Sequence, residues 1–171
     1  MILIDILTDG FFAAIAAIGF GAISDPPLRA FPSIALLSAI GHSLRFCLMH
    51  YLGVDIAAAS LCASFSIGMV SLLLGKRIYC PMTVLYIPAL LPMIPGMFAY
   101  KTVFSLIMFM QNMKVPELKQ KYLIDLFTNG IVTCSVIFML AVGATIPLFL
   151  FIKQAFSLTR RKKVTNSEVN Q

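Results

Sequence analysis

Charge is scarce in this chain, and negative charge is scarcer than positive. Of its 171 residues only 12% are charged, with seven Asp and Glu against thirteen Lys and Arg, while 60% are hydrophobic. An ordinary soluble domain carries about 25% charged residues. The mean hydropathy of +0.94 agrees with this shortage. Composition therefore excludes a soluble globular domain and indicates a chain that lies in a lipid bilayer.

The residues of metal and enzyme chemistry are also few. The chain has two histidines and four cysteines, and no two cysteines form a CxxC pair. This spacing indicates neither a zinc site nor a disulfide framework. Because no paired catalytic signature and no Walker motif is present, we expect no enzyme, no metal, no cofactor and no P-loop nucleotide site. The cysteines are interpreted as small buried hydrophobes; they are Cys47, Cys62, Cys80 and Cys134.

The net charge of +6 does not indicate a nucleic-acid partner. The basic residues do not gather on one face, and five of the thirteen fall between Lys153 and Lys163. Such a cluster beside an apolar segment is typical of a topological anchor. At the other end, Asp5 and Asp9 stand where a cleavable signal peptide would carry basic residues. The first helix is therefore expected to remain in the protein.

Hydropathy predicts an all-α polytopic membrane protein with about five transmembrane helices. The second segment is the weakest, because His42 and Arg45 lower its hydropathy; were it only re-entrant, four crossings would result. Residues 1–152 would form the transmembrane domain and residues 153–171 a basic, polar cytoplasmic tail. The expected segments are Ile4–Ile23, Ile34–Leu52, Ile56–Leu74, Pro81–Met110 and Leu123–Ile152.

The fourth segment is too long and too interrupted for one continuous helix. Its thirty mostly apolar residues, 81–110, are broken by Pro88, Pro92 and Pro95, with Gly96 following. Each proline removes a backbone donor, and unpaired backbone is tolerated at membrane depth only inside protein or beside a water-filled cavity. Transporters place substrate sites at such broken helices. A kinked helix without a ligand is the plainer alternative.

The distribution of basic residues predicts that the amino end lies outside and the carboxyl end in the cytoplasm. In that orientation eight Lys and Arg lie inside and three outside. The outer three are in residues 111–122, which we expect to form an exposed external loop; they are Lys114, Lys119 and Lys121. The inner eight are Arg29, Lys76, Arg77, Lys153, Arg160, Arg161, Lys162 and Lys163.

A polar stripe follows one face of the second helix, because its members recur at three- and four-residue steps. They are Ser38, Gly41, His42, Arg45 and Met49. An ionisable residue within a membrane normally faces the bundle interior or an aqueous cavity. The stripe therefore marks the most unusual chemistry of the chain.

Arg45 is the first candidate for substrate contact, because a guanidinium can hold a carboxylate by two parallel hydrogen bonds. An organic acid or amino acid is the cargo that this indicates. Alternatively, Arg45 reaches the membrane interface or neutralises an acid such as Asp9, Asp25 or Asp55. His42 lies one turn away and offers a route for proton coupling; the alternative is an interhelical hydrogen bond.

Three further stripes repeat every four residues. Small residues at this spacing let helices approach closely in lipid, and two stripes are of this kind: Ala13, Ala17 and Gly21, then Ser60, Ser64 and Gly68. The third is polar and lies in the last helix; its members are Asp125, Asn129 and Thr133. Asn129 and Thr133 are candidates for a vestibule, and a hydrogen-bonded helix interface is the equal alternative.

Two strings taken together resemble a known family. They are GFGAISDPPLRAFPSIALLSAIGHSLR, residues 19–45, and PALLPMIPGMFAY, residues 88–100. The first holds a proline and an arginine before a GHxxR helix, and the second a PAxxPxxPGxxxY break. Over most of the chain, up to about residue 152, it resembles the small, YjjB-type subunit of the split threonine/serine exporter family.

The resemblance implies a bacterial inner-membrane exporter built from two polypeptides. The larger, YjjP-type subunit of such pairs carries a cytoplasmic domain and its own membrane helices. Members export threonine and serine, and split pairs are associated with dicarboxylates such as succinate. Both cargoes offer a carboxylate to Arg45. A non-transporting assembly or regulatory subunit is the alternative function, and a homo-oligomer stays open.

The resemblance also implies which residues matter. Pro95 and Gly96 would begin the second half-helix, whose free amides and positive dipole end suit an anion. Pro26 and Arg29 are assigned to topology or gating, and for Arg29, at the predicted cytoplasmic rim, topology alone is the slightly better interpretation. The substrate-binding candidates are Gly41, His42, Arg45, Pro88, Pro92, Pro95, Gly96 and Tyr100.

Overall fold

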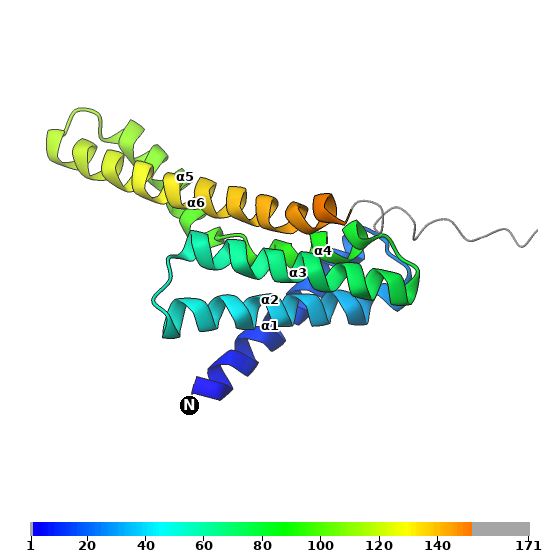
Figure 1. Cartoon of the computed structure of the whole chain (residues 1–171). Helices are drawn as coiled ribbons and strands as arrows, with labels where there is room; N and C mark the ends of the chain where they lie inside the picture. The colour runs from blue at the N-terminus through cyan, green and yellow to red at the C-terminus, as the bar shows by residue number, and fades with distance from the viewer. Residues whose placement is uncertain (1, 152–171) are drawn as a thin grey trace, which may run out of the picture.

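The computed structural model describes residues 2–151, and these are helical apart from short connections (Figure 1). The all-α prediction is confirmed. In chain order the elements are α1 (Ile2–Ile23), the short 3-10 helix η1 (Leu28–Ala30), α2 (Phe31–Tyr51), α3 (Ile56–Ile78), α4 (Met82–Leu90), the 3-10 helix η2 (Leu91–Met93), α5 (Gly96–Gln111) and α6 (Pro116–Leu150).

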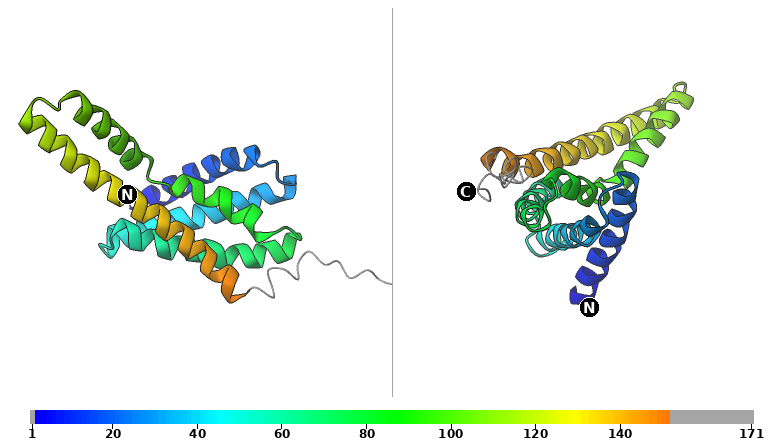
Figure 2. Two further views of the ribbon diagram at one scale, coloured as in Figure 1. Left: turned by 90° about the horizontal axis from the view of Figure 1, so that it is seen from above. Right: turned by 90° about the vertical axis from the view of Figure 1, so that its right-hand side faces the viewer.

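The helices α1, α2, α3 and α4 form the bundle, and the second half of α6 covers α3 (Figure 2). The core is built from small and branched side chains, because close helix packing in lipid depends on shape rather than on exclusion of water. Ile34, Leu37, Ile67 and Leu85 are fully buried within it. The bundle therefore has an interior in which the polar stripe of α2 can be enclosed.

The small-residue stripe of α1 is a contact face, as the sequence predicts, and the structure shows that it packs against α2. The Ser38 hydroxyl donates to the carbonyl of Ala13 at 3.0 Å. At Gly21 an added Cβ would lie 3.3 Å from Ile34. Both α1 contacts therefore need the close approach that small residues allow.

The small-residue stripe of α3 packs against α6, and the two helices run in parallel. A Cβ added at Gly143 would meet the Ser64 hydroxyl, and one added at Gly68 would lie 2.8 Å from Pro147. The Ser64 hydroxyl also donates to the carbonyl of Met139 at 3.4 Å. Residues later in α3 thus contact residues later in α6, which makes the two helices parallel. Both predicted stripes, in α1 and in α3, are therefore contact faces within one chain.

The predicted break in the fourth segment is confirmed and lies between Leu91 and Pro95. The helix tightens into η2, turns extended at Ile94 and restarts as α5 after Pro95. α4 and α5 are bent by 56° from one another. Pro92 and Pro95 explain the position, because neither can donate a backbone hydrogen bond to continue the helix.

The number of crossings depends on this bent pair. Four helices are long and apolar enough to span a membrane, and there are five if α4, η2 and α5 together make one span. α2 is unbroken over 21 residues. The segment whose crossing is ambiguous by length and bend is therefore the α4–α5 pair, whereas α2 is long and apolar enough to span a membrane.

The expectation of an external loop over residues 111–122 is wrong for most of its length. Only residues 112–115 connect the helices, and α6 begins at Pro116. Proline is well suited to the first helical position and Glu117 favours the positive end of the helix dipole. The polar composition of this stretch therefore belongs to a helix that continues beyond the apolar region.

A helical hairpin, formed by α5 and the first half of α6, projects from one end of the bundle (Figure 1, upper left). α6 can both cover α3 and extend into the hairpin, because its 35 residues make a helix about 52 Å long. Among the described elements, α5 packs extensively only against α6. The hairpin exposes many apolar side chains, among them Met97, Val103, Ile107, Ile124, Phe127 and Ile131.

The α1–α2 and α3–α4 connections lie at the same end of the bundle. Arg29, in the first connection, is close enough to Cys80, in the second, for its charge to oppose the rise in the pKa of that thiol that burial causes. Lys76 and Arg77 occupy the last turn of α3 at this end. The proposed tail, residues 153–171, lies outside the described residues.

Candidate functional site

A polar cluster lies where the face of α2 meets the break between α4 and α5. The Nη1 atom of Arg45 donates to the backbone carbonyl of Met93 at 2.7 Å. Arg45 is half-buried, and Met93 is fully buried. The first candidate from the sequence is thus brought directly to the predicted break.

The break leaves carbonyl groups that its own backbone does not satisfy. The Gly96 N–H donates to the carbonyl of Ile94 at 2.8 Å and is thereby turned away from Pro92. Pro95, three residues after Pro92, has no N–H at all. The carbonyl of Pro92 consequently lacks both of its usual helical donors, and the carbonyl of Met93 is taken by Arg45.

His42 joins this cluster to α1. Its Nδ1 atom lies 3.3 Å from Oδ2 of Asp9, and the two side chains are 10% and 40% exposed respectively. The carbonyl of Pro92 lies close to the same imidazole. The other ring nitrogen, Nε2, is buried and has no hydrogen-bond partner among the described residues.

Close packing of α1 on α2 places Asp9 next to His42. A Cβ added at Gly10 would lie 2.7 Å from the Ser43 hydroxyl, and that hydroxyl donates to the carbonyl of Ile6 at 3.4 Å. Asp9 therefore reaches α2 because its neighbour is glycine. The sequence singles out Asp9 only as a possible charge partner of Arg45; its signal is a carboxylate in an apolar helix.

Gly41 contributes to the same cluster because it has no side chain. A Cβ added there would lie 2.8 Å from Cγ1 of Ile67 and 3.5 Å from the sulfur of Met93. Glycine at this position lets α3 and the break approach α2 together. Its place in the structure is a packing position beside Arg45 and His42.

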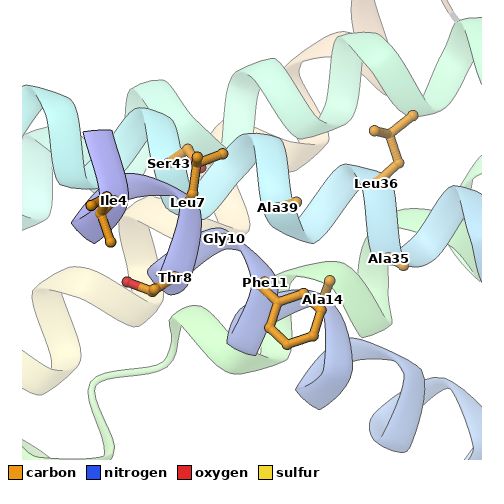
Figure 3. Close-up of a pocket in the computed structure, with 10 residues that line it drawn as sticks. All are labelled: Ile4, Leu7, Thr8, Gly10, Phe11, Ala14, Ala35, Leu36, Ala39 and Ser43. Atoms are coloured by element: carbon orange, nitrogen blue, oxygen red, sulfur yellow. The ribbon is translucent and has the colours of Figure 1, made fainter. Parts of the chain in front are cut away.

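An apolar groove of about 730 Å³ lies beside the cluster, between α1 and α2 (Figure 3). Figure 3 shows Gly10 and Ala14 of α1 opposite Ala35 and Ala39 of α2. The polar residues that line the groove, Thr8 and Ser43, already donate hydrogen bonds to backbone carbonyls. A groove with this lining suits hydrocarbon, whereas the charged groups that can hold a carboxylate are in the Arg45 cluster.

Comparison with protein-family models identifies the family of this chain. The family model described as "Threonine/Serine exporter, ThrE" matches residues 9–150. The chain belongs to the threonine/serine exporter family. No solved structure matches it. Membership of a transporter family supports a transport function in a multi-pass membrane protein.

Only some of the motif residues meet in this cluster. Gly41, His42, Arg45 and the carbonyls at Pro92 and Met93 form the cluster described above. Pro88 is buried within α4 and faces Gly21 of α1, where an added Cβ would lie 3.8 Å from it. Pro95 is buried at the start of α5, and Gly96 beside it is exposed.

Tyr100 makes no described contact with the Arg45 cluster. It is 64% exposed and stacks on Phe104 of its own helix, with 6.2 Å between ring centroids. Nothing among the described contacts joins its hydroxyl to Arg45 or His42. A substrate role for Tyr100 stays a prediction.

The remaining candidate residues occupy other regions of the chain. Asn129 donates to the carbonyl of Asp125 at 2.7 Å, and Thr133 donates to the carbonyl of Asn129 at 2.8 Å. Their polar groups are thus satisfied along α6 itself, and the vestibule stays a prediction. Pro26 is buried in the α1–α2 connection and Arg29 is exposed there.

Proposed function

We propose that this chain is the small membrane subunit of a two-component exporter of small metabolites that carry a carboxylate. The observation that supports this most directly is the hydrogen bond from Arg45 to the Met93 carbonyl, 2.7 Å long. It joins a permanent positive charge to the one broken segment of the bundle. Transporters combine these same features at their substrate sites.

Arg45 can exchange partners as the substrate binds. A guanidinium has five N–H donors, and the structure uses Nη1 for the bond to Met93. A carboxylate forms a stronger, charge-assisted and bidentate bond than a neutral carbonyl does. A bound carboxylate therefore competes with the Met93 carbonyl for Arg45 and releases one attachment between α2 and the break.

The cargo would be threonine or serine, or a dicarboxylate such as succinate. Each presents a carboxylate of the size that one guanidinium can hold. Arg45 recognises the group that these molecules share. The cluster around it also contains Asp9, which can attract an ammonium group and repel a second carboxylate.

A second polypeptide would complete the exporter. Many transporter folds combine two related repeats around one site, and the 171 residues here show one set of helices without an evident inverted repeat. The larger subunit expected from the resemblance would supply the other set and a cytoplasmic domain. The complex would lie in a bacterial inner membrane, with Arg29 and the other basic connections in the cytoplasm.

Export of labelled threonine, serine and succinate tests this proposal. Cells would express this chain with and without the larger subunit, and the variant Arg45→Ala would be compared with Lys119→Ala, which alters an exposed base at the start of α6. We expect flux that requires both chains and survives Lys119→Ala. We expect Arg45→Ala to abolish flux while the two chains still co-purify.

Unchanged flux in an assembled Arg45→Ala complex would contradict the proposal and assign the chain to assembly or regulation. Flux from this chain alone would contradict the two-component part only. These two outcomes are separate, because the first concerns the site and the second concerns the subunit composition.

A further inference from the structure

The buried nitrogen of His42 has a defined chemical state. Asp9 accepts a hydrogen bond from Nδ1, at 3.3 Å, when that nitrogen carries the proton. A neutral imidazole has one donor and one acceptor nitrogen, so Nε2 is then the acceptor. The carbonyl of Pro92, which lies near the ring, is an acceptor as well. Two acceptors cannot bond, so in this tautomer the imidazole offers no hydrogen bond to that carbonyl, and Nε2 has no partner among the described residues.

A proton on Nε2 removes this mismatch. The imidazolium has a donor on both nitrogens, so Nδ1–H can be held by Asp9 while Nε2–H donates to the Pro92 carbonyl. That carbonyl has no competing helical donor, because Pro95 lacks an N–H and Gly96 donates to Ile94. One bound proton thus creates one hydrogen bond between α2 and the break.

We propose that the Asp9–His42 pair is the proton site of this exporter and that its protonation fastens the α4–α5 break to α2. With the proton bound, α2 holds two successive carbonyls: Pro92 through His42 and Met93 through Arg45. Without it, Met93 alone is held. No covalent bond changes; the proton enters at Nε2 and leaves from the same atom. This inference rests on the proposed function and names its coupling ion.

The two charged groups around His42 act on a proton there in opposite directions. Asp9 faces it from α1 and Arg45 lies on its own helix, and these are the two charged groups that act on it among the described residues. The α3 residue that packs against this part of α2 is the apolar Ile67, and η2 contributes backbone carbonyls such as that of Met93. Asp9 and Arg45 cancel, so the proton raises the net charge of the cluster from zero to +1 and favours a carboxylate.

The protonation state of His42 can be measured without any transport. The chain has only two histidines, so the purified variant His50→Gln, labelled with 15N-histidine, reports His42 alone by NMR. We expect Nδ1 to stay protonated and Nε2 to gain the proton as the pH is lowered from 9 to 5. In Asp9→Asn the preference for the Nδ1–H tautomer should be lost. A neutral Nε2–H tautomer, or no titration of Nε2 in this range, overturns the proposal.

The coupling can be measured in inverted membrane vesicles that contain both subunits. If one proton moves with each substrate, the accumulation ratio changes about tenfold for each unit of imposed pH difference. We expect this dependence to vanish in His42→Gln and Asp9→Asn and to persist in Ser43→Ala, which removes an α1–α2 hydrogen bond but no titratable group. Full pH dependence in His42→Gln overturns the proposal.

The two measurements keep the inference separate from the proposed function. Absence of flux in the wild-type complex contradicts the exporter proposal, whereas the NMR titration still decides whether His42 and Asp9 form a proton site. Should His42→Gln be inactive, the NMR titration again decides.

Discussion

At the scale of single residues, three charged or titratable side chains make polar contacts within one apolar bundle. Arg45 binds the Met93 carbonyl and His42 meets Asp9. Arg45 and Met93 are 48 positions apart in the sequence, and Asp9 and His42 are 33 positions apart. These side chains lie where α1, α2 and η2 meet.

Replacement of Arg45 by lysine distinguishes charge from geometry. Lysine keeps the positive charge but offers a point charge in place of a planar fork. Loss of a charge-assisted hydrogen bond costs about 1.5–3 kcal/mol, which corresponds to a rise in KM of roughly tenfold to a hundredfold. We expect this rise in Arg45→Lys when flux is measured against substrate concentration. An unchanged KM would show that the substrate does not use the fork.

At the scale of helices, close approach determines the packing. α3 and α6 touch through Gly68 and Gly143, and α1 and α2 through Gly10 and Gly21. In lipid this contact replaces the hydrophobic effect as the source of association. The bundle is therefore sensitive to single methyl groups at these positions.

The variant Gly143→Ala tests this sensitivity. The added methyl group would meet the Ser64 hydroxyl and lie 2.6 Å from the carbonyl of Leu61. Overpacking of this kind costs about 1–3 kcal/mol, so we expect a lower melting temperature in detergent, followed by circular dichroism. The matched control is Gly19→Ala, where nothing lies within 4 Å of the added Cβ. Equal melting temperatures for the two variants would disprove the contact.

The break between α4 and α5 depends on Pro95. Replacing it by alanine restores an N–H three residues after Pro92, so that the helix can continue through the break. We expect Pro95→Ala to reduce the 56° bend between α4 and α5. Spin labels at the exposed positions Ile87 and Val103, in a cysteine-free chain, should then move farther apart. An unaltered distance between these labels would assign the bend to tertiary packing instead of proline.

At the scale of the whole molecule, the basic connections gather at one end of the bundle. The α1–α2 and α3–α4 connections meet there, with Arg29 near Cys80 and with Lys76 and Arg77 at the end of α3. The α5–α6 connection lies at the opposite end (Figure 1). Charge and fold therefore agree on which connections share a side of the membrane.

Thiol labelling measures the orientation that this arrangement predicts. Single cysteines at Leu28 and Met113, which are 85% and 58% exposed, would be introduced into a cysteine-free chain. An impermeant maleimide added to intact cells should label the variant Met113→Cys and spare Leu28→Cys, because basic connections stay in the cytoplasm. Disrupted cells provide the control in which both are labelled. The reverse pattern in intact cells would invert the topology.

The number and type of helices, the broken segment and the small-residue contact faces were all determined by the sequence. Hydropathy and four-residue spacing are local properties, so they can be recognised without knowledge of the neighbours. The start of α6 was mispredicted for the same reason, since polar residues 116–122 have a loop-like composition although Pro116 begins a helix there.

Only the tertiary structure decided what the polar residues meet. The sequence placed Arg45 and His42 on one face of α2 and left open whether their partners were acids, lipid interface or substrate. Folding brought Met93 to Arg45 and Asp9 to His42, because the break exposes carbonyls at that depth and Gly10 allows α1 to approach. Such partners are set by packing between elements remote in sequence, and no local pattern specifies them.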